Sequence, residues 1–147
     1  MSLIHSLVNS GATPALERAA EFTEARHGIL AHSIANASTP YFRPEDLSPR
    51  GFQATLREAI DRRRELANPI RGDLEMRDTR QLQFNERGLS GWTPEASNQG
   101  ILRHDQNNAN LERMMQHLAE NTMMHDLSTS LLRNQFSQLQ IAIRGRL

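Results

Sequence analysis

The sequence predicts a mainly α-helical protein in which a helix near each end of the chain forms an antiparallel, coiled-coil-like pair around an irregular insert. Two observations support this fold class. Apolar residues repeat in steps of four and three along two segments, the spacing that keeps one side of a helix against a partner. The segment between them holds most of the chain's prolines and glycines, which are typical of turns and loops. We expect it to be partly β or disordered.

Five segments follow from these patterns. They are an N-terminal tail over residues 1–12, a helix over 13–40, an insert over 41–106, a long helix over 107–144 and a short tail over 145–147.

The C-terminal helix has the longer repeat, which is unbroken from residue 111 to residue 143. At 1.5 Å per residue, a helix of this length spans roughly 50 Å. Its predicted packing stripe consists of Leu111, Met115, Leu118, Thr122, His125, Thr129, Leu132, Phe136, Leu139 and Ile143.

The N-terminal helix is expected to begin with Thr13 as N-cap and Pro14 in its first turn, since threonine caps helices and proline fits the first position. It is expected to end at Thr39-Pro40, because the residue before a proline avoids the helical conformation. Its predicted packing stripe consists of Leu16, Ala20, Thr23, His27, Leu30 and Ile34.

Both helices have a second apolar side that a single partner helix cannot cover. We predict that this side contacts neighbouring molecules, because exposed apolar patches are typical of protein interfaces and methionine suits adaptable contacts. The alternative is that the stripe drifts around a straight helix by ~20° per heptad. The predicted lateral-contact residues are Phe22, Ile29, Met123, Met124, Leu127 and Leu131.

The insert is expected to contain one short helix near 49–67, which Ser48-Pro49 begins, and a small β-hairpin or extended loop around Phe84 and Trp92. The run Arg62-Arg63-Arg64 is expected on a solvated face. Because the insert has few apolar residues, we expect it to be poorly ordered alone. The apolar side of its helix consists of Phe52, Leu56 and Ile60.

The N-terminal tail is weakly apolar, and its apolar residues have a spacing compatible with a helix. Two interpretations remain open: a frayed terminus, or a partner-binding segment that folds only against its partner. The residues concerned are Leu3, Ile4, Leu7 and Val8.

Composition and motifs argue against catalysis, cofactors and metals. Lys and Arg total 17, as do Asp and Glu, and cysteine is absent. The sequence has no basic stripe with interleaved aromatics for nucleic acid and no motif for phosphate binding or a nucleophile. Its histidine pairs are five residues apart (His27, His32) and eight apart (His117, His125), unlike the i,i+4 pair of a helical zinc site. We expect no enzyme activity and no small-molecule substrate.

Membrane spans and cleaved signals are not expected either. No stretch approaches the ~20 apolar residues of a transmembrane helix. The first residues lack the basic and apolar regions of a secretory signal peptide.

Residues 32–43, with the sequence His-Ser-Ile-Ala-Asn-Ala-Ser-Thr-Pro-Tyr-Phe-Arg, resemble the N-I-A-N-x-x-T-P-G-Y-K motif of the axial proteins of the bacterial flagellum. Ser33 replaces the first Asn, and Tyr41 stands where Gly is usual. Phe42 and Arg43 stand in for Tyr and Lys. The matching residues are Ile34, Ala35, Asn36, Thr39 and Pro40.

The C-terminal half narrows the resemblance. Segments 107–112, 118–121 and 131–143 look like the proximal rod proteins of the FlgB family, and residues 46–56 fit the same pattern. The resemblance covers roughly residues 13–60 and 105–144 of the chain. FlgC-type rod proteins share the N-terminal motif but usually differ in the second half of the final helix.

The resemblance implies a structural subunit of the proximal rod, exported by the flagellar type III apparatus without a cleaved signal peptide and assembled helically in the periplasm. It implies contacts with other copies of the chain, a FlgC-type rod protein, a FliE-type adaptor, and the MS ring and export gate. The alternative is a soluble helical binding module: a FlgC-like rod subunit, an export chaperone or a coiled-coil homodimer.

Overall fold

The computed structural model of the 147-residue chain describes residues 11–65, 74–96 and 111–145. The helices in these ranges are α2 (Thr13–Ala35), α3 (Pro49–Glu65) and α4 (Leu111–Arg144). The strands are β1 (Glu45–Asp46), β2 (Leu82–Asn85), β3 (Gly88–Trp92) and β4 (Glu95–Ala96). The predicted mainly helical fold class, with a small β-containing insert, is therefore confirmed.

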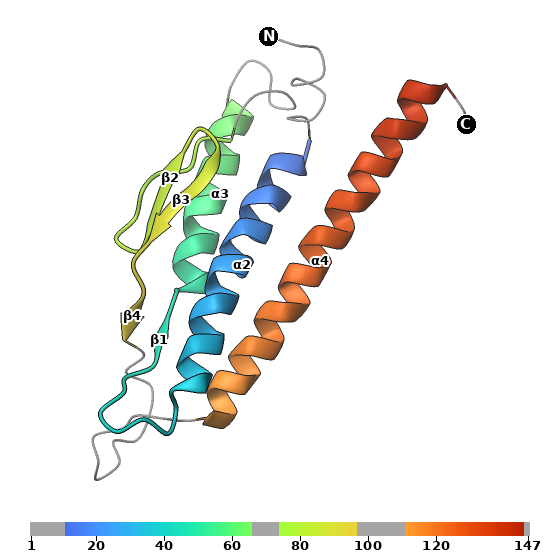
Figure 1. Cartoon of the computed structure of the whole chain (residues 1–147). Coiled ribbons are helices and arrows are strands. Elements are labelled where there is room, and N and C mark those ends of the chain that lie inside the picture. Colours follow the sequence, from blue (N-terminus) through green and yellow to red (C-terminus); the bar gives the residue numbers. More distant parts are fainter. Residues whose placement is uncertain (1–10, 66–73, 97–110, 146–147) are drawn as a thin grey trace.

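Helix α2 lies at the centre of the molecule (Figure 1). Helix α4 runs along one side of α2, and α3 and the β2–β3 hairpin lie on the other side. Helices α2 and α4 are antiparallel, which confirms the predicted pairing, and the start of α2 lies at the same end of the molecule as the end of α4. Because α2 has 23 residues and α4 has 34, the last part of α4 extends beyond the start of α2.

The ends of α2 differ from the prediction. Ala12 occupies the N-cap position without a side-chain cap, and Thr13 is a buried residue inside the first turn. The helix stops at Ala35 rather than at Pro40. Both the backbone N–H of Asn36 and its side-chain amide donate to the carbonyl oxygen of His32, at 3.1 and 2.9 Å. The His32 carbonyl in the last turn of α2 thus accepts two hydrogen bonds from Asn36.

The described parts of the insert supply most of the hydrophobic core. The rings of Phe22 and Phe52 stack with centroids 4.2 Å apart and planes 4° from parallel. The insert's few apolar residues thus pack on α2 and on one another, which accounts for the regular elements within residues 45–65 and 74–96. The expectation that the insert is poorly ordered alone stays a prediction. The core cluster, which contains no residue of α4, consists of Phe22, Ala25, Leu47, Phe52 and Leu82.

Helix α3 begins as the Ser48-Pro49 signal predicts. The hydroxyl of Ser48 accepts a hydrogen bond from the backbone N–H of Gly51 at 3.1 Å, so Ser48 is the N-cap. The arginine run at the other end is not wholly solvated. Arg63 is buried and donates to the carbonyl oxygen of Gly11 at 3.1 Å, whereas Arg64 is exposed. The prediction of a solvated face is wrong for Arg63, because its guanidinium links α3 to the chain just before α2.

Two small antiparallel sheets complete the insert. Strand β2 pairs with β3 in the predicted hairpin, and β1 pairs with β4, so the two ends of the described insert meet. None of the helices in the described ranges is long and apolar enough to cross a membrane.

Candidate assembly interface

The contact between α2 and α4 is unusually polar on the side of α4. Within the described residues of α4, only Met114, Asn121 and Ser128 are buried, and two of these three side chains are polar. On α2, Thr23, Leu30 and Ser33 are among the buried residues. Helix α4 is therefore held against α2 largely by small and hydrogen-bonding side chains.

A layer of hydrogen bonds lies near the middle of this contact. The side-chain amide of Asn121 donates to the carbonyl oxygen of Thr23 at 2.7 Å. The Thr23 hydroxyl lies 2.9 Å from the carbonyl oxygens of both Ala19 and Ala20, which share its single proton as acceptors. Its oxygen also lies within hydrogen-bond distance of Nδ1 of His125, at 3.0 Å. Such directional bonds fix the register of the two helices.

A second polar link joins three elements. The guanidinium of Arg26 donates to both carboxylate oxygens of Asp46, each at 2.7 Å, and Arg26 is buried. Nδ1 of His117 lies 3.6 Å from the same carboxylate. Asp46 thus connects the middle of α2 to β1 and to the beginning of α4.

The predicted packing stripe is only partly the observed one. Leu30 is buried, and half-buried positions are occupied by Leu16, Ala20, Ile34, Leu118, Leu132 and Leu139. Of the remaining predicted positions of α4, His125 and Thr129 are half-buried, and the exposed ones are Leu111, Met115, Thr122, Phe136 and Ile143.

The buried positions of α4 lie one residue earlier than predicted. Met114, Asn121 and Ser128 face α2, whereas Met115 and Thr122 are exposed. The sequence contained this stripe as well, because residues 114, 118, 121, 125, 128, 132 and 135 also repeat in steps of four and three. The prediction chose the more apolar of two adjacent repeats. The observed one contains the small and polar side chains that can approach and hydrogen-bond to α2.

The two predicted lateral faces have different outcomes. Phe22 is only 4% exposed and Ile29 packs against the core, so the prediction that they contact a neighbouring molecule is wrong. The protein's own insert covers that face of α2. On α4, all four predicted lateral residues are exposed: Met123, Met124, Leu127 and Leu131.

The motif at the end of α2 forms a tight turn and a junction with β1. The backbone N–H of Phe42 donates to the carbonyl oxygen of Thr39 at 3.2 Å, with Pro40 second and Tyr41 third in the turn. Tyr41 has φ of +63° and is 73% exposed. This is the arrangement of a type II turn, whose third position favours glycine.

Ser33 links the motif to the insert. Its hydroxyl donates to the carbonyl oxygen of Glu45 at 3.1 Å and accepts from the N–H of Glu45 at 3.0 Å. Ile34 is half-buried, while Ala35, Thr39 and Pro40 are exposed. The motif residues therefore shape the end of α2 rather than form a binding site.

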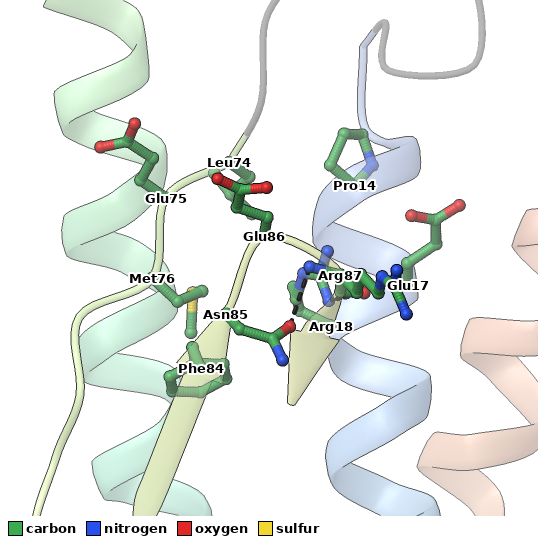
Figure 2. Close-up of a pocket in the computed structure, with 10 residues that line it drawn as sticks. All are labelled: Pro14, Glu17, Arg18, Leu74, Glu75, Met76, Phe84, Asn85, Glu86 and Arg87. Carbon is green, nitrogen blue, oxygen red and sulfur yellow. Dashed lines mark hydrogen bonds between the residues drawn. The ribbon is translucent and has the colours of Figure 1, made fainter. Parts of the chain in front are cut away.

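A hollow of about 680 Å³ lies near the start of α2, between α2, the tip of the hairpin and residues 74–76 (Figure 2). Burial raises the pKa of the Glu17 carboxyl, an effect that Arg18 opposes and Glu21 reinforces. Among the described residues that line this hollow there is no serine, threonine, cysteine, histidine or lysine. In the described part of the chain, no cluster of three or more histidine and carboxylate side chains is placed to hold a metal ion.

The hairpin tip is fastened to α2 beside this hollow. Arg18 donates to the Glu21 carboxylate at 2.7 Å and to the carbonyl oxygen of Arg87 at 3.1 Å. The carboxylate of Glu21 also accepts from the N–H of Leu89 at 2.9 Å. Gly88 has φ of +136°, and a Cβ at this position would collide with the side chains of Arg18 and Glu21. These contacts hold the insert on α2.

Several predicted elements fall on residues that the structure does not describe. The partner-binding tail residues Leu3, Ile4, Leu7 and Val8 lie outside the described residues. So do residues 107–110 of the predicted C-terminal helix and residues 66–67 of the predicted short helix.

Comparison with known proteins identifies the family. No protein-family model matches the chain. The flagellar basal body rod protein FlgB of Borrelia hermsii is 30% identical to it over 122 residues, which cover 81% of this chain and 85% of the relative. This similarity agrees with the motif at the end of α2 and with the pair of long terminal helices. The chain belongs to the FlgB family of flagellar basal body rod proteins.

Proposed function

We propose that this protein is a structural subunit of the proximal rod in the flagellar basal body, and that the outer surface of α4 is its main assembly surface. The observation that supports this proposal is the orientation of α4. Two of the three buried side chains of α4 are polar, while most of its large apolar side chains are exposed, including Met123 at 74%. A helix in this orientation is suited to burial by neighbouring subunits.

The energetic scale is sufficient for assembly. Burying one exposed leucine or methionine side chain contributes about 1.5–3 kcal/mol. Association costs roughly 4–15 kcal/mol in lost freedom of motion. Burial of several side chains is therefore enough to offset that cost. The exposed large apolar residues of α4 are Leu111, Met115, Met123, Met124, Leu127, Leu131, Phe136, Ile141 and Ile143.

The route to the rod is part of the same proposal. The chain is exported by the flagellar type III apparatus without a cleaved signal peptide and assembles helically in the periplasm, where it connects the MS ring and export gate to the rest of the rod. Its neighbours are other copies of itself, a FlgC-type rod protein and a FliE-type adaptor. The few buried apolar side chains between α2 and α4 support this route, because a chain that must unfold for export benefits from a weakly apolar contact.

No catalytic role is proposed. The polar groups of the described residues that line the hollow beside α2 are carboxylates, guanidinium groups and an amide, and these residues include no nucleophile with its base. A structural role needs neither.

Complementation of a strain that lacks the gene tests the function. The wild-type chain should restore swimming and be present in isolated basal bodies. A chain with Leu127→Asp and Leu131→Asp should accumulate in the cell with unchanged helicity by circular dichroism, yet fail to restore swimming, because charges replace apolar contacts on α4. The matched control places Asp at the exposed α3 positions Gln53 and Ala54 and should restore swimming.

Two results would contradict the proposal. One is a strain that lacks the chain and still builds normal flagella. The other is a purified chain that forms a stable, closed dimer at micromolar concentration in analytical ultracentrifugation, which would favour the soluble helical module.

A further inference from the structure

Resting on the proposed function, we infer that α4 joins one copy of the chain to the next through two different flanks of the same helix. The second flank of one copy inserts into the first flank of its neighbour. The first flank is the apolar hollow lined by Met115, Leu118, Ala119, Thr122, Met123 and Asp126. The second flank is the row of exposed side chains Met124, Leu127 and Leu131.

The two flanks lie on opposite sides of the contact with α2. Successive residues of an α-helix are about 100° apart around its axis. Counted from the stripe through Met114, Asn121 and Ser128, the first flank centres roughly 130° to one side and the second roughly 85° to the other. Both flanks are accessible at once, and one neighbour cannot cover both.

The first flank has the form of two adjacent holes. In side-by-side helix packing, one side chain inserts into a hole formed by four residues of the facing helix at i, i+3, i+4 and i+7. Residues 115, 118, 119 and 122 form one such set, and residues 119, 122, 123 and 126 form the next. The two holes are four residues apart, and the small side chain of Ala119 belongs to both.

The second flank supplies two side chains at the same separation. Leu127 and Leu131 are also four residues apart and are 52% and 42% exposed. Between parallel copies, Leu127 fits the first hole and Leu131 the second. Each leucine lies eight to nine residues further along α4 than the centre of the hole that it fills in the neighbouring copy. At 1.5 Å per residue, the two copies are therefore offset along the helix axis by roughly 13 Å.

The described surface favours a second copy as the partner. Outside α4, the exposed large apolar residues of the described ranges are Tyr41 and Trp92. Neither belongs to a row that can fill two holes, whereas α4 has such a row. The second flank contains no charged residue, and the first contains one, Asp126 at its edge. Because the contact uses a different surface on each copy and leaves one flank of each free, it is heterologous and can grow into a helical array.

Disulfide cross-linking in assembled basal bodies tests this contact, since the chain has no cysteine of its own. Cells co-express one chain with Ala119→Cys and another, with a longer tag, carrying Leu127→Cys. Mild oxidation should yield only the mixed dimer, and a chain with both substitutions should yield a ladder of higher oligomers. The control pair, Ala119→Cys with Gln53→Cys on α3, should remain monomeric.

The possible outcomes separate the contact from the function. Dimers of Ala119→Cys alone, or swimming cells whose rods contain both cysteines without the mixed product, overturn the contact and leave the proposed function standing. Absence of the wild-type chain from basal bodies overturns both.

A charge exchange provides a second measurement in case the cysteine variants do not assemble. Ala119→Glu alone and Leu127→Arg alone should each reduce swimming at least tenfold in spreading assays, and the double variant should restore it. Failure of the double variant to exceed both single variants contradicts the pairing of these two positions.

Discussion

The side-chain amide of Asn121 donates to the backbone carbonyl of Thr23 over 2.7 Å, and Asn121 is only 2% exposed. The other atom of this amide, Oδ1, has no hydrogen-bond partner and is buried. Asn121 thus joins the two long helices through one short hydrogen bond and leaves its own buried acceptor unsatisfied.

This arrangement predicts a large effect of Asn121→Asp. The substitution places a carboxylate beside the Thr23 carbonyl, where it lacks a donor, so it should destabilise the fold by about 2–5 kcal/mol. Urea denaturation followed by circular dichroism measures the change. Asn134→Asp, at an exposed position of α4, is the control and should change stability by less than about 0.5 kcal/mol. Equal effects of the two variants would show that Asn121 is not confined between the helices.

Two glycines should respond to alanine in opposite directions. Gly88→Ala should destabilise by roughly 2–4 kcal/mol, because its positive φ is unfavourable for alanine and the new methyl group meets Arg18 and Glu21. Gly28 lies in α2 with no atom within 4 Å of a built Cβ. Gly28→Ala should therefore stabilise by about 0.5–1 kcal/mol. Thermal unfolding of both variants tests the pair, and stabilisation by Gly88→Ala would contradict the docking of the hairpin tip.

Tyr41 occupies a turn position with positive φ, and substitutions there should measure what this backbone conformation costs a residue that has a side chain. Tyr41→Gly removes the unfavourable contact of Cβ with the backbone, and Tyr41→Val replaces the residue with a β-branched one that tolerates this region poorly. The glycine variant should be more stable than the valine variant by about 1–2 kcal/mol. A difference near zero in chemical denaturation would mean that the turn relaxes without loss.

The pKa of Glu17, raised by burial, predicts a pH-dependent effect. A carboxyl whose pKa is higher in the folded state favours folding in its protonated form. That contribution is present below the unfolded-state pKa and is lost as the pH rises through the folded-state pKa. Glu17→Gln should therefore raise the melting temperature more at pH 7 than at pH 4. Glu24→Gln at an exposed site on the same helix is the control, and equal shifts at both pH values for Glu17→Gln would refute the prediction.

Much of the fold could be derived from spacing and turn signals. The four-three repeats predicted both long helices, and Ser48-Pro49 located the start of α3, because a capping hydroxyl acts within one turn. The ends of α2 were less accessible. The helix ends at Ala35, with Asn36 as C-cap, before the proline that was expected to end it.

The candidate interface was harder to predict because two stripes of α4 differ by one residue. Apolar content favoured the stripe through Met115, whereas hydrogen bonds to α2 place Asn121 and Ser128 inside. The burial of Phe22 could not be predicted, because Phe52, the residue that covers it, lies 30 residues away in sequence and local spacing does not specify such a partner. Because the polar side of α4 packs against α2, the predicted lateral residues of α4 are left exposed.

The core cluster around Phe22 and Phe52 has no member from α4, whose one buried apolar side chain in the described residues is Met114, and this has a consequence for cooperativity. Segments that unfold independently do so when few buried apolar contacts tie them to the rest. Amide hydrogen exchange of the subunit should therefore be faster throughout α4 than in the α2–α3 region. Helix α4, which carries the proposed assembly surface, therefore opens at a lower free energy than the α2–α3 region, which holds the core cluster.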